Sequence, residues 1–176
     1  MKKRNNIVLI GFMGVGKGTV ARALYKLTGK FAIDCDDMIE SLANMKISEI
    51  FKTKGEDEFR KMESDLAKFL LKNVNNAIIS TGGGFYKTKN LEKLGEIVYL
   101  KGDFDYIINR IKASPNATKK IAKRPLLKNL EKAKELHSQR DLLYAKKADI
   151  TINVENKTPK QIAKEIVKNL KNTTSL

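Results

Sequence analysis

The sequence predicts an α/β fold in which helices flank a parallel sheet. Three observations carry this prediction: short apolar runs alternate with helical patterns, a glycine-rich loop joins the first run to a helix, and polar or glycine residues follow several of the runs. The 176 residues suffice for one domain with a sizeable core, and a second full domain is not expected.

Five apolar runs are expected to form the strands. They are Asn6–Ile10, Phe31–Asp34, Ala77–Thr81, Ile97–Lys101 and Asp149–Val154. Helical patterns fill the intervals between them. The expected helices are Lys17–Thr28, Asp37–Ala43, Ile47–Phe51, Glu56–Lys72, Thr88–Leu94, Phe104–Ile111, Lys128–Ala145 and Pro159–Lys171. This alternation is typical of βα units around a parallel sheet.

Composition and charge exclude several classes of protein. The net charge of +15 comes from 35 basic residues, mostly lysines spread along the chain, without an arginine-rich arm or a recognisable nucleic-acid module. We therefore expect a surface suited to anionic metabolites and no nucleic-acid partner. The single cysteine, Cys35, excludes an intramolecular disulfide framework and fits a reducing cytosol. Since no run approaches the ~20 apolar residues that span a bilayer, we expect no membrane partner. We also expect the protein to be a cytoplasmic monomer.

The first strand leads into a loop that is expected to bind phosphate. Gly11, Gly14 and Gly16 let backbone N–H groups turn toward an anion, Lys17 adds a mobile positive charge, and the next helix points its N-terminus at the same place. The expected ligand is a nucleoside triphosphate. An ordinary strand-to-helix turn would explain the glycines but not the lysine.

One position departs from the common Walker A pattern. In that pattern the lysine is followed directly by a serine or threonine that ligates Mg²⁺. Here Lys17 is followed by Gly18 and only then by Thr19. We therefore expect the protein to be active but to bind Mg²⁺ with an altered affinity.

The second strand ends in a run of acidic residues. Because alternate residues of an extended chain point to the same side, Asp34 and Asp36 are expected to face the cleft while Cys35 packs inward. Asp34 suits Mg²⁺, held through water, and Asp36 suits an acceptor hydroxyl, which it can orient or deprotonate. Asp37 is expected only to cap the following helix.

The third strand ends in Gly82, Gly83 and Gly84. Three consecutive glycines allow close backbone approach and leave N–H groups available for a small polar substrate or a phosphate. The alternative is a flexible connection to the next helix. In an open parallel sheet the carboxyl ends of strands gather the ligands, so these glycines and the acidic run are expected to share one cleft.

Two helical arginines differ in what their positions imply. Arg60, with Glu56 four residues before it and Glu63 three after, is expected to form surface salt bridges. Arg140 falls within the apolar stripe of its helix, where a charge needs a partner, either a protein carboxylate or an anionic substrate. His137 lies on the same stripe and is expected to pack rather than catalyse.

The segment before Pro125 has the composition of a lid. Residues 112–123 show no periodicity and carry several lysines, and Arg124 follows them. Such an arginine can close over the phosphates and stabilise charge in the transition state. The alternative is a plain surface loop with a solvated arginine.

Six motifs together resemble the shikimate kinase family, in the nucleoside-monophosphate-kinase-like branch of P-loop proteins. They are Gly11–Thr19, Asp34-Cys35-Asp36, Glu58-Phe59-Arg60, Gly82-Gly83-Gly84, Lys123-Arg124-Pro125-Leu126-Leu127, and Arg140 with Leu143-Tyr144. Their order and spacing match across nearly the whole chain. The resemblance implies a three-layer P-loop kinase fold with a five-stranded parallel sheet, formed by residues 1–176 as one domain, with a mobile lid at about 112–124 and a substrate-binding helical region at about 35–62.

The resemblance also implies a reaction and a set of site residues. The reaction is ATP-dependent phosphorylation of the 3-hydroxyl of shikimate, in aromatic amino-acid biosynthesis, with Mg²⁺ as cofactor. The implied catalytic residues are Lys17, Asp36 and Arg124. The implied ATP-binding residues are Gly14, Val15, Gly16, Lys17, Gly18, Thr19, Arg110, Arg124, Asn156 and Pro159. The implied shikimate-binding residues are Asp36, Arg60, Gly82, Gly83, Gly84 and Arg140. Asp34 is implied to bind Mg²⁺ through water, and the usual serine ligand is replaced by Gly18.

Two alternative functions stay open on the sequence alone. The Gly-Lys-Gly-Thr ending of the phosphate loop also occurs in adenylate kinases, which makes another small-molecule or nucleotide kinase the nearest rival. The glycine triplet and the Arg-Pro-Leu sequence favour shikimate over AMP as the acceptor. The charge of +15 motivates a nucleotide-dependent binding module that acts on nucleic acid.

Overall fold

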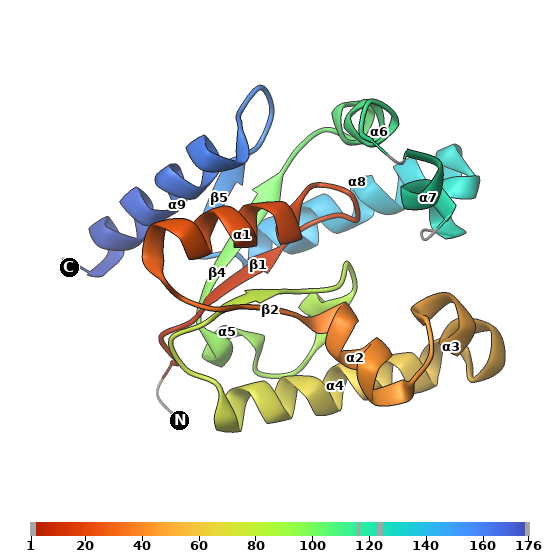
Figure 1. Cartoon of the computed structure of the whole chain (residues 1–176), viewed down its shortest axis with the longest axis horizontal. Coiled ribbons are helices and arrows are strands. Elements are labelled where there is room, and N and C mark those ends of the chain that lie inside the picture. The colour runs from red at the N-terminus through yellow and green to blue at the C-terminus, as the bar shows by residue number, and fades with distance from the viewer. Residues whose placement is uncertain (1–2, 116, 123–124, 175–176) are drawn as a thin grey trace.

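A computed structural model describes residues 3–115, 117–122 and 125–174, and it confirms the predicted α/β architecture (Figure 1). The sheet has five strands in the order β2-β3-β1-β4-β5, and every neighbouring pair is parallel. The strands are β1 (Ile7–Ile10), β2 (Ala32–Asp34), β3 (Ile78–Ser80), β4 (Glu96–Lys101) and β5 (Ile150–Asn153). Each end lies within one residue of the predicted position.

Helices cover the sheet on two sides. They are α1 (Lys17–Thr28), α2 (Cys35–Ala43), α3 (Ile47–Thr53), α4 (Gly55–Asn73), α5 (Leu91–Leu94), α6 (Phe104–Lys112), α7 (Ala117–Ala122), α8 (Leu130–Lys147) and α9 (Pro159–Thr174), with short 3₁₀ helices η1 (Phe85–Lys87) and η2 (Pro125–Lys128). Helices α1 and α9 pack together on one side, and α4 and α5 lie across the sheet from them (Figure 1). Among the described helices, none combines the length and the apolar character needed to cross a membrane.

The central strand β1 explains where the site lies. All four of its residues are buried, as expected for a parallel strand covered by helices on both faces. It pairs with β3 on one side and β4 on the other, and β3 in turn pairs with β2. The carboxyl ends of β1, β2 and β3 therefore lie next to one another, which is the convergence that the sequence predicted.

A second, smaller apolar cluster holds the helical region after β2. Ile39, Ile50 and Phe59 come from α2, α3 and α4 and are buried against one another, apart from the main core. This cluster holds α2, α3 and α4 against one another.

Several helices differ from the prediction, and the ends of α3, α8 and α9 are displaced by two or three residues. Helix α2 begins at Cys35 and not at Asp37, because Asp34 caps it. Helix α5 spans only Leu91–Leu94, since Asn90 before it takes a left-handed conformation with φ 60°. Helix α7 forms inside the stretch that was expected to lack regular structure, where alanine and lysine have high helix propensity.

Candidate active site

The loop between β1 and α1 has the geometry of a phosphate cradle. Gly16 caps α1 with φ 106°, and a Cβ at that position would collide with the guanidinium of Arg110. Glycine is therefore required there by both backbone and space. The ammonium of Lys17 donates to the carbonyl oxygens of Gly11 (2.7 Å) and Phe12 (3.1 Å), so it lies across its own loop.

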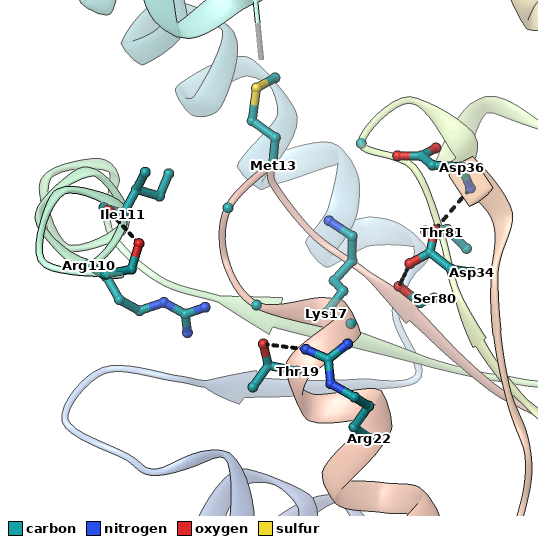
Figure 2. A pocket seen from close by; sticks show the side chains of 15 residues that line it. Met13, Lys17, Thr19, Arg22, Asp34, Asp36, Ser80, Thr81, Arg110 and Ile111 are labelled. Atoms are coloured by element: carbon teal, nitrogen blue, oxygen red, sulfur yellow. Dashed lines mark hydrogen bonds between the residues drawn. The ribbon is translucent and has the colours of Figure 1, made fainter. Parts of the chain in front are cut away.

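A pocket of about 400 Å³ opens beside this loop (Figure 2). Its lining residues are Met13, Gly14, Gly16, Lys17, Gly18, Thr19, Arg22, Asp34, Asp36, Ser80, Thr81, Gly83, Arg110, Ile111 and Ser114. In the view of Figure 2, Lys17 and Arg22 lie between Arg110 on one side and the two aspartates on the other. The pocket thus combines cations that suit a triphosphate with carboxylates that suit a metal and a hydroxyl.

Asp34 both lines the pocket and caps α2. Its Oδ1 accepts hydrogen bonds from the backbone N–H groups of Asp36 (3.0 Å) and Asp37 (3.4 Å), while its Oδ2 accepts one from the Ser80 hydroxyl (3.0 Å). The prediction that Asp37 is the cap was wrong by three positions, because the strand ends at Asp34 and the chain turns into the helix at once.

Asp36 lies in the first turn of α2, not on an extended chain as the prediction assumed, and it nevertheless reaches the pocket. Burial and the negative charge of Asp34 raise the pKa of Asp36 to about 6, against the lowering effect of Lys17. A Cβ on Gly82 would lie 2.6 Å from Asp36 Oδ1, so the glycine lets this carboxylate approach the turn after β3.

Arg60 forms the two predicted ion pairs, but only one of them is at the surface. Its Nη2 lies 2.7 Å from Glu56, whose side chain is 60% exposed, and its Nη1 lies 2.6 Å from Glu63, whose side chain is 2% exposed. Burial raises the pKa of Glu63, and the ion pair with Arg60 opposes this. The Oε1 atom of Glu63 has no hydrogen-bond partner within the described part of the chain. A Cβ on Gly84 would collide with the Arg60 guanidinium, so this ion pair also lies against the glycine triplet.

Arg140 is buried, as its position on the apolar stripe predicted, and contacts the same triplet. It is 8% exposed, and its Nη1 donates to the carbonyl oxygen of Gly83 at 3.1 Å. Within the described residues 3–115, 117–122 and 125–174, Arg140 forms no ion pair with a carboxylate. His137 packs as predicted: its ring meets Phe12 edge-on with centroids 5.0 Å apart, and its Nε2 is 3.0 Å from the Gly102 carbonyl oxygen.

The remaining predicted nucleotide-binding residues differ in where they lie. Arg110 lines the pocket against the phosphate loop. Val15 is 1% exposed, and its backbone N–H donates to Phe12. Asn156 takes φ 57° in the turn after β5, and Pro159 begins α9; neither lines the pocket. Arg124 lies outside the described residues.

Several residues in or near the pocket were missed by the sequence analysis. Ser80 and Thr81 immediately precede the glycine triplet, and that proximity was an available signal. Glu63 occupies a buried position between Phe59 and Ala67 on α4, so its helical spacing from Phe59 could have revealed its burial. Arg22 carries no signal that separates it from the many surface cations of the chain.

The residues around Asp34 fit a magnesium ion that is bound largely by phosphate and water. Asp34 lines the pocket together with Gly18, and a Cβ at Gly18 would lie 3.7 Å from Asp34 Oδ2. No group of three or more histidine, cysteine, aspartate or glutamate side chains suited to a metal occurs in the described residues. Mg²⁺ commonly uses one or two carboxylates together with substrate phosphates and waters, and this arrangement suits it.

Comparison with known proteins gives one consistent family. A sequence model of the shikimate kinase family matches residues 13–171. A shikimate kinase of Helicobacter hepaticus is 40% identical over 148 residues, which cover 84% of this chain and 86% of that protein. A shikimate kinase of Sulfurihydrogenibium sp. is 39% identical over 172 residues, which cover 94% of this chain and 98% of that protein. The solved shikimate kinase of Acinetobacter baumannii in complex with shikimate has a TM-score of 0.82 at 29% identity, with 98% of this chain and 96% of that one covered.

Proposed function

The chain belongs to the shikimate kinase family, and from that premise we propose that it transfers the terminal phosphoryl group of ATP to the 3-hydroxyl of shikimate. The observation that carries this proposal is the position of Asp36. It lines one pocket with Lys17 of the phosphate loop, and it also lies against the glycine turn that Arg60 and Arg140 surround. A carboxylate in that position suits an acceptor that has both a hydroxyl and a carboxylate.

Arg60 and Arg140 bind the shikimate carboxylate in this proposal, beside the glycine triplet. The support is electrostatic: Arg140 is buried, and its guanidinium donates to a neutral carbonyl group, that of Gly83. A buried guanidinium gains most from an ionised partner. Arg60 is already held in place by Glu56 and Glu63, so its guanidinium is oriented before substrate arrives.

The chemical step is direct in-line transfer. The 3-hydroxyl oxygen forms a bond to the γ-phosphorus while the bond from that phosphorus to the β–γ bridging oxygen breaks, and ADP leaves. Asp36 orients the hydroxyl and accepts its proton, and Lys17 stabilises the charge on the β- and γ-phosphates. Positioning and charge neutralisation carry most of the rate, without a covalent enzyme intermediate.

The nucleotide and metal side of the site completes the proposal. Asp34 would hold Mg²⁺ through water, and the ion would supply charge neutralisation at the phosphates. Arg124 closes over the phosphates from the lid at residues 112–124, while Arg110, Asn156 and Pro159 border the adenine. We further propose that the chain acts as a cytoplasmic monomer without nucleic acid.

ADP release in a coupled assay tests the function directly. ATP and Mg²⁺ are supplied with shikimate, with AMP, or with neither acceptor. Release that depends on shikimate supports the proposal. Release that depends on AMP identifies a nucleotide kinase instead, and folded protein that is inactive with both acceptors refutes transfer to shikimate.

A further inference from the structure

The carbonyl oxygen of Gly83 accepts two hydrogen bonds from helix α8. Arg140 Nη1 donates to it at 3.1 Å, and the hydroxyl of Tyr144 donates to it at 2.6 Å. The two donors are four residues apart and so lie on one face of the helix. The middle residue of the substrate-binding triplet is therefore held by two side chains, although a carbonyl needs only one donor to be satisfied when buried.

Tyr144 is rigidly placed for this contact. It is 1% exposed, and its ring packs against those of Tyr86 and Tyr99 with centroids 5.0 and 5.2 Å away. Burial raises the pKa of Tyr144 to about 12, although Arg140 opposes the rise, so the hydroxyl stays protonated and remains a donor at neutral pH.

Arg140 differs from Tyr144, because binding the substrate carboxylate requires Arg140 to change its hydrogen-bond partner. A carboxylate is a stronger acceptor for a guanidinium than a neutral carbonyl. When Arg140 turns toward a substrate carboxylate, it weakens or gives up its bond to Gly83. Without a second donor, that exchange would leave a partly buried carbonyl unpaired, and the penalty would reduce the affinity for substrate.

The same contact also fixes a neighbouring group. The peptide bond between Gly83 and Gly84 is planar, and no cis peptide bond occurs in the described residues. A carbonyl held toward Tyr144 therefore sets the direction of the Gly84 N–H as well. Glycine has no side chain to restrict its backbone, so an outside contact of this kind is what limits the orientations of the turn.

We propose that Tyr144 is a positioning residue for shikimate binding: its hydroxyl keeps the Gly83 carbonyl paired and fixed while Arg140 moves to the substrate carboxylate. The inference rests on the proposed function, since it takes shikimate as the ligand of Arg140.

The test compares Tyr144→Phe with Tyr86→Phe, a matched control. Both changes remove one hydroxyl from the same buried aromatic cluster, and in the described part of the chain the side-chain donors to the Gly83 carbonyl are Arg140 and Tyr144, not Tyr86. We expect Tyr144→Phe to raise the KM for shikimate by up to about tenfold, at the low end of the range for leaving an acceptor unpaired, because the Gly83 carbonyl is partly buried. The KM for ATP and kcat should change by less than about twofold on the same reasoning. Tyr86→Phe should leave all three unchanged.

A double-mutant cycle with Arg140→Ala separates this role from a general structural one. Without Arg140 no exchange takes place, so loss of the Tyr144 hydroxyl affects the free and bound states equally. Titration with shikimate should then show no additional loss of affinity from Tyr144→Phe in that background. Full additivity, or an equal rise in KM for shikimate and ATP, would overturn the inference. Failure of the wild-type protein to bind shikimate would overturn the proposed function and this inference with it, whereas binding that Tyr144→Phe leaves unchanged would overturn the inference alone.

Discussion

Asp36 shows at the residue scale how function opposes stability in this site. Its carboxyl is buried beside Asp34, and both effects raise its pKa from the ordinary 3.8 to about 6. The folded chain therefore binds this proton more tightly than the unfolded chain does. Ionising Asp36 costs stability progressively as the pH rises from about 4 to about 6, and the full cost applies above that range. The same ionised form is the one that can accept a proton from a substrate hydroxyl.

Asp36→Asn is expected to lower kcat by about 10²- to 10⁴-fold, the usual contribution of a general base. It should also raise the melting temperature at about pH 8, because the buried charge is gone, and the gain should shrink as the pH falls toward 4. Steady-state kinetics and thermal unfolding across this pH range measure both effects. Asp37→Asn, which changes an exposed neighbouring acid, is the control. A near-normal rate for Asp36→Asn would remove the proposed catalytic role.

Wild-type activity should follow the same titration. The rate should be highest where Asp36 is ionised and should fall as the pH drops below about 6, since protonation blocks proton acceptance. A profile of kcat/KM against pH reports this group in the free enzyme. A rate that stays level well below that value would show that Asp36 acts without accepting a proton.

Gly18 is a second residue whose effect can be isolated. A Cβ there would lie 3.7 Å from Asp34 Oδ2 and 3.8 Å from Arg22 Nη1, which are ordinary contacts, so serine fits without displacing either side chain. Gly18→Ser should lower the Mg²⁺ concentration for half-maximal activity several-fold, because it supplies the usual hydroxyl ligand. Titration of the ADP complex with Mg²⁺ should show the same shift. Gly18→Ala is the control, since it fills the space without a hydroxyl. Unchanged metal dependence in Gly18→Ser would show that the departure from the Walker A pattern has no effect on the metal.

At the element scale, helix α2 depends on the residue that is also proposed to hold the metal. Asp34 caps α2 and, by ending β2, places Asp36 in the first helical turn. One side chain thus sets both the start of an element and the chemistry of the pocket. Substitutions of Asp34 that keep the helix cap but remove the charge can distinguish its structural role from its proposed role at the metal.

Asp34→Asn keeps a side chain that can cap a helix but removes the charge, whereas Asp34→Ala removes both. We expect the alanine variant to be less stable to denaturant than the asparagine variant by about 1 kcal/mol, the usual contribution of an N-cap. Both variants should lose Mg²⁺ affinity to a similar extent. Equal stability of the two variants would contradict the capping role, and normal Mg²⁺ binding by Asp34→Asn would contradict the metal role.

On the scale of the whole molecule, the two proposed ligands are bound by different elements. The nucleotide side comes from the loop after β1, from α1 and from α6, while the acceptor side comes from α2, α4, α8 and the turn after β3. These elements meet only because the strand order brings three strand ends together. Binding to the two sides should therefore be separable by mutation.

Arg140→Ala should abolish most of the thermal stabilisation by shikimate and leave that by ATP intact. A ligand at about 100 times its Kd stabilises a protein by about 2.7 kcal/mol, so both shifts are measurable. Each shift is compared with the ligand-free form of the same variant. Lys134→Ala, at an exposed position on the same helix, is the control. Loss of both shifts in Arg140→Ala would indicate misfolding instead of a lost substrate contact.

The sequence by itself determined the five strands, the phosphate loop and the family of the chain. Periodicity and local turn chemistry depend on neighbouring residues, and the ends of the strands could be predicted for that reason. The burial of Arg140 and the packing of His137 followed from the apolar stripe of one helix in the same way. The start of α2 was misplaced because Asp34 and Asp37 are equally good caps in a linear sequence.

Only the tertiary structure decided which partners these residues meet. Glu63 is buried because α4 turns that face toward the glycine triplet, and Tyr144 reaches Gly83 because α8 packs beside the end of β3. Gly83 and Tyr144 are separated by 61 positions in the sequence, and the sequence gives no sign of this contact. Contacts of this kind depend on how elements pack in three dimensions, and so do the burial, the pKa shifts and the hydrogen bonds that follow from them.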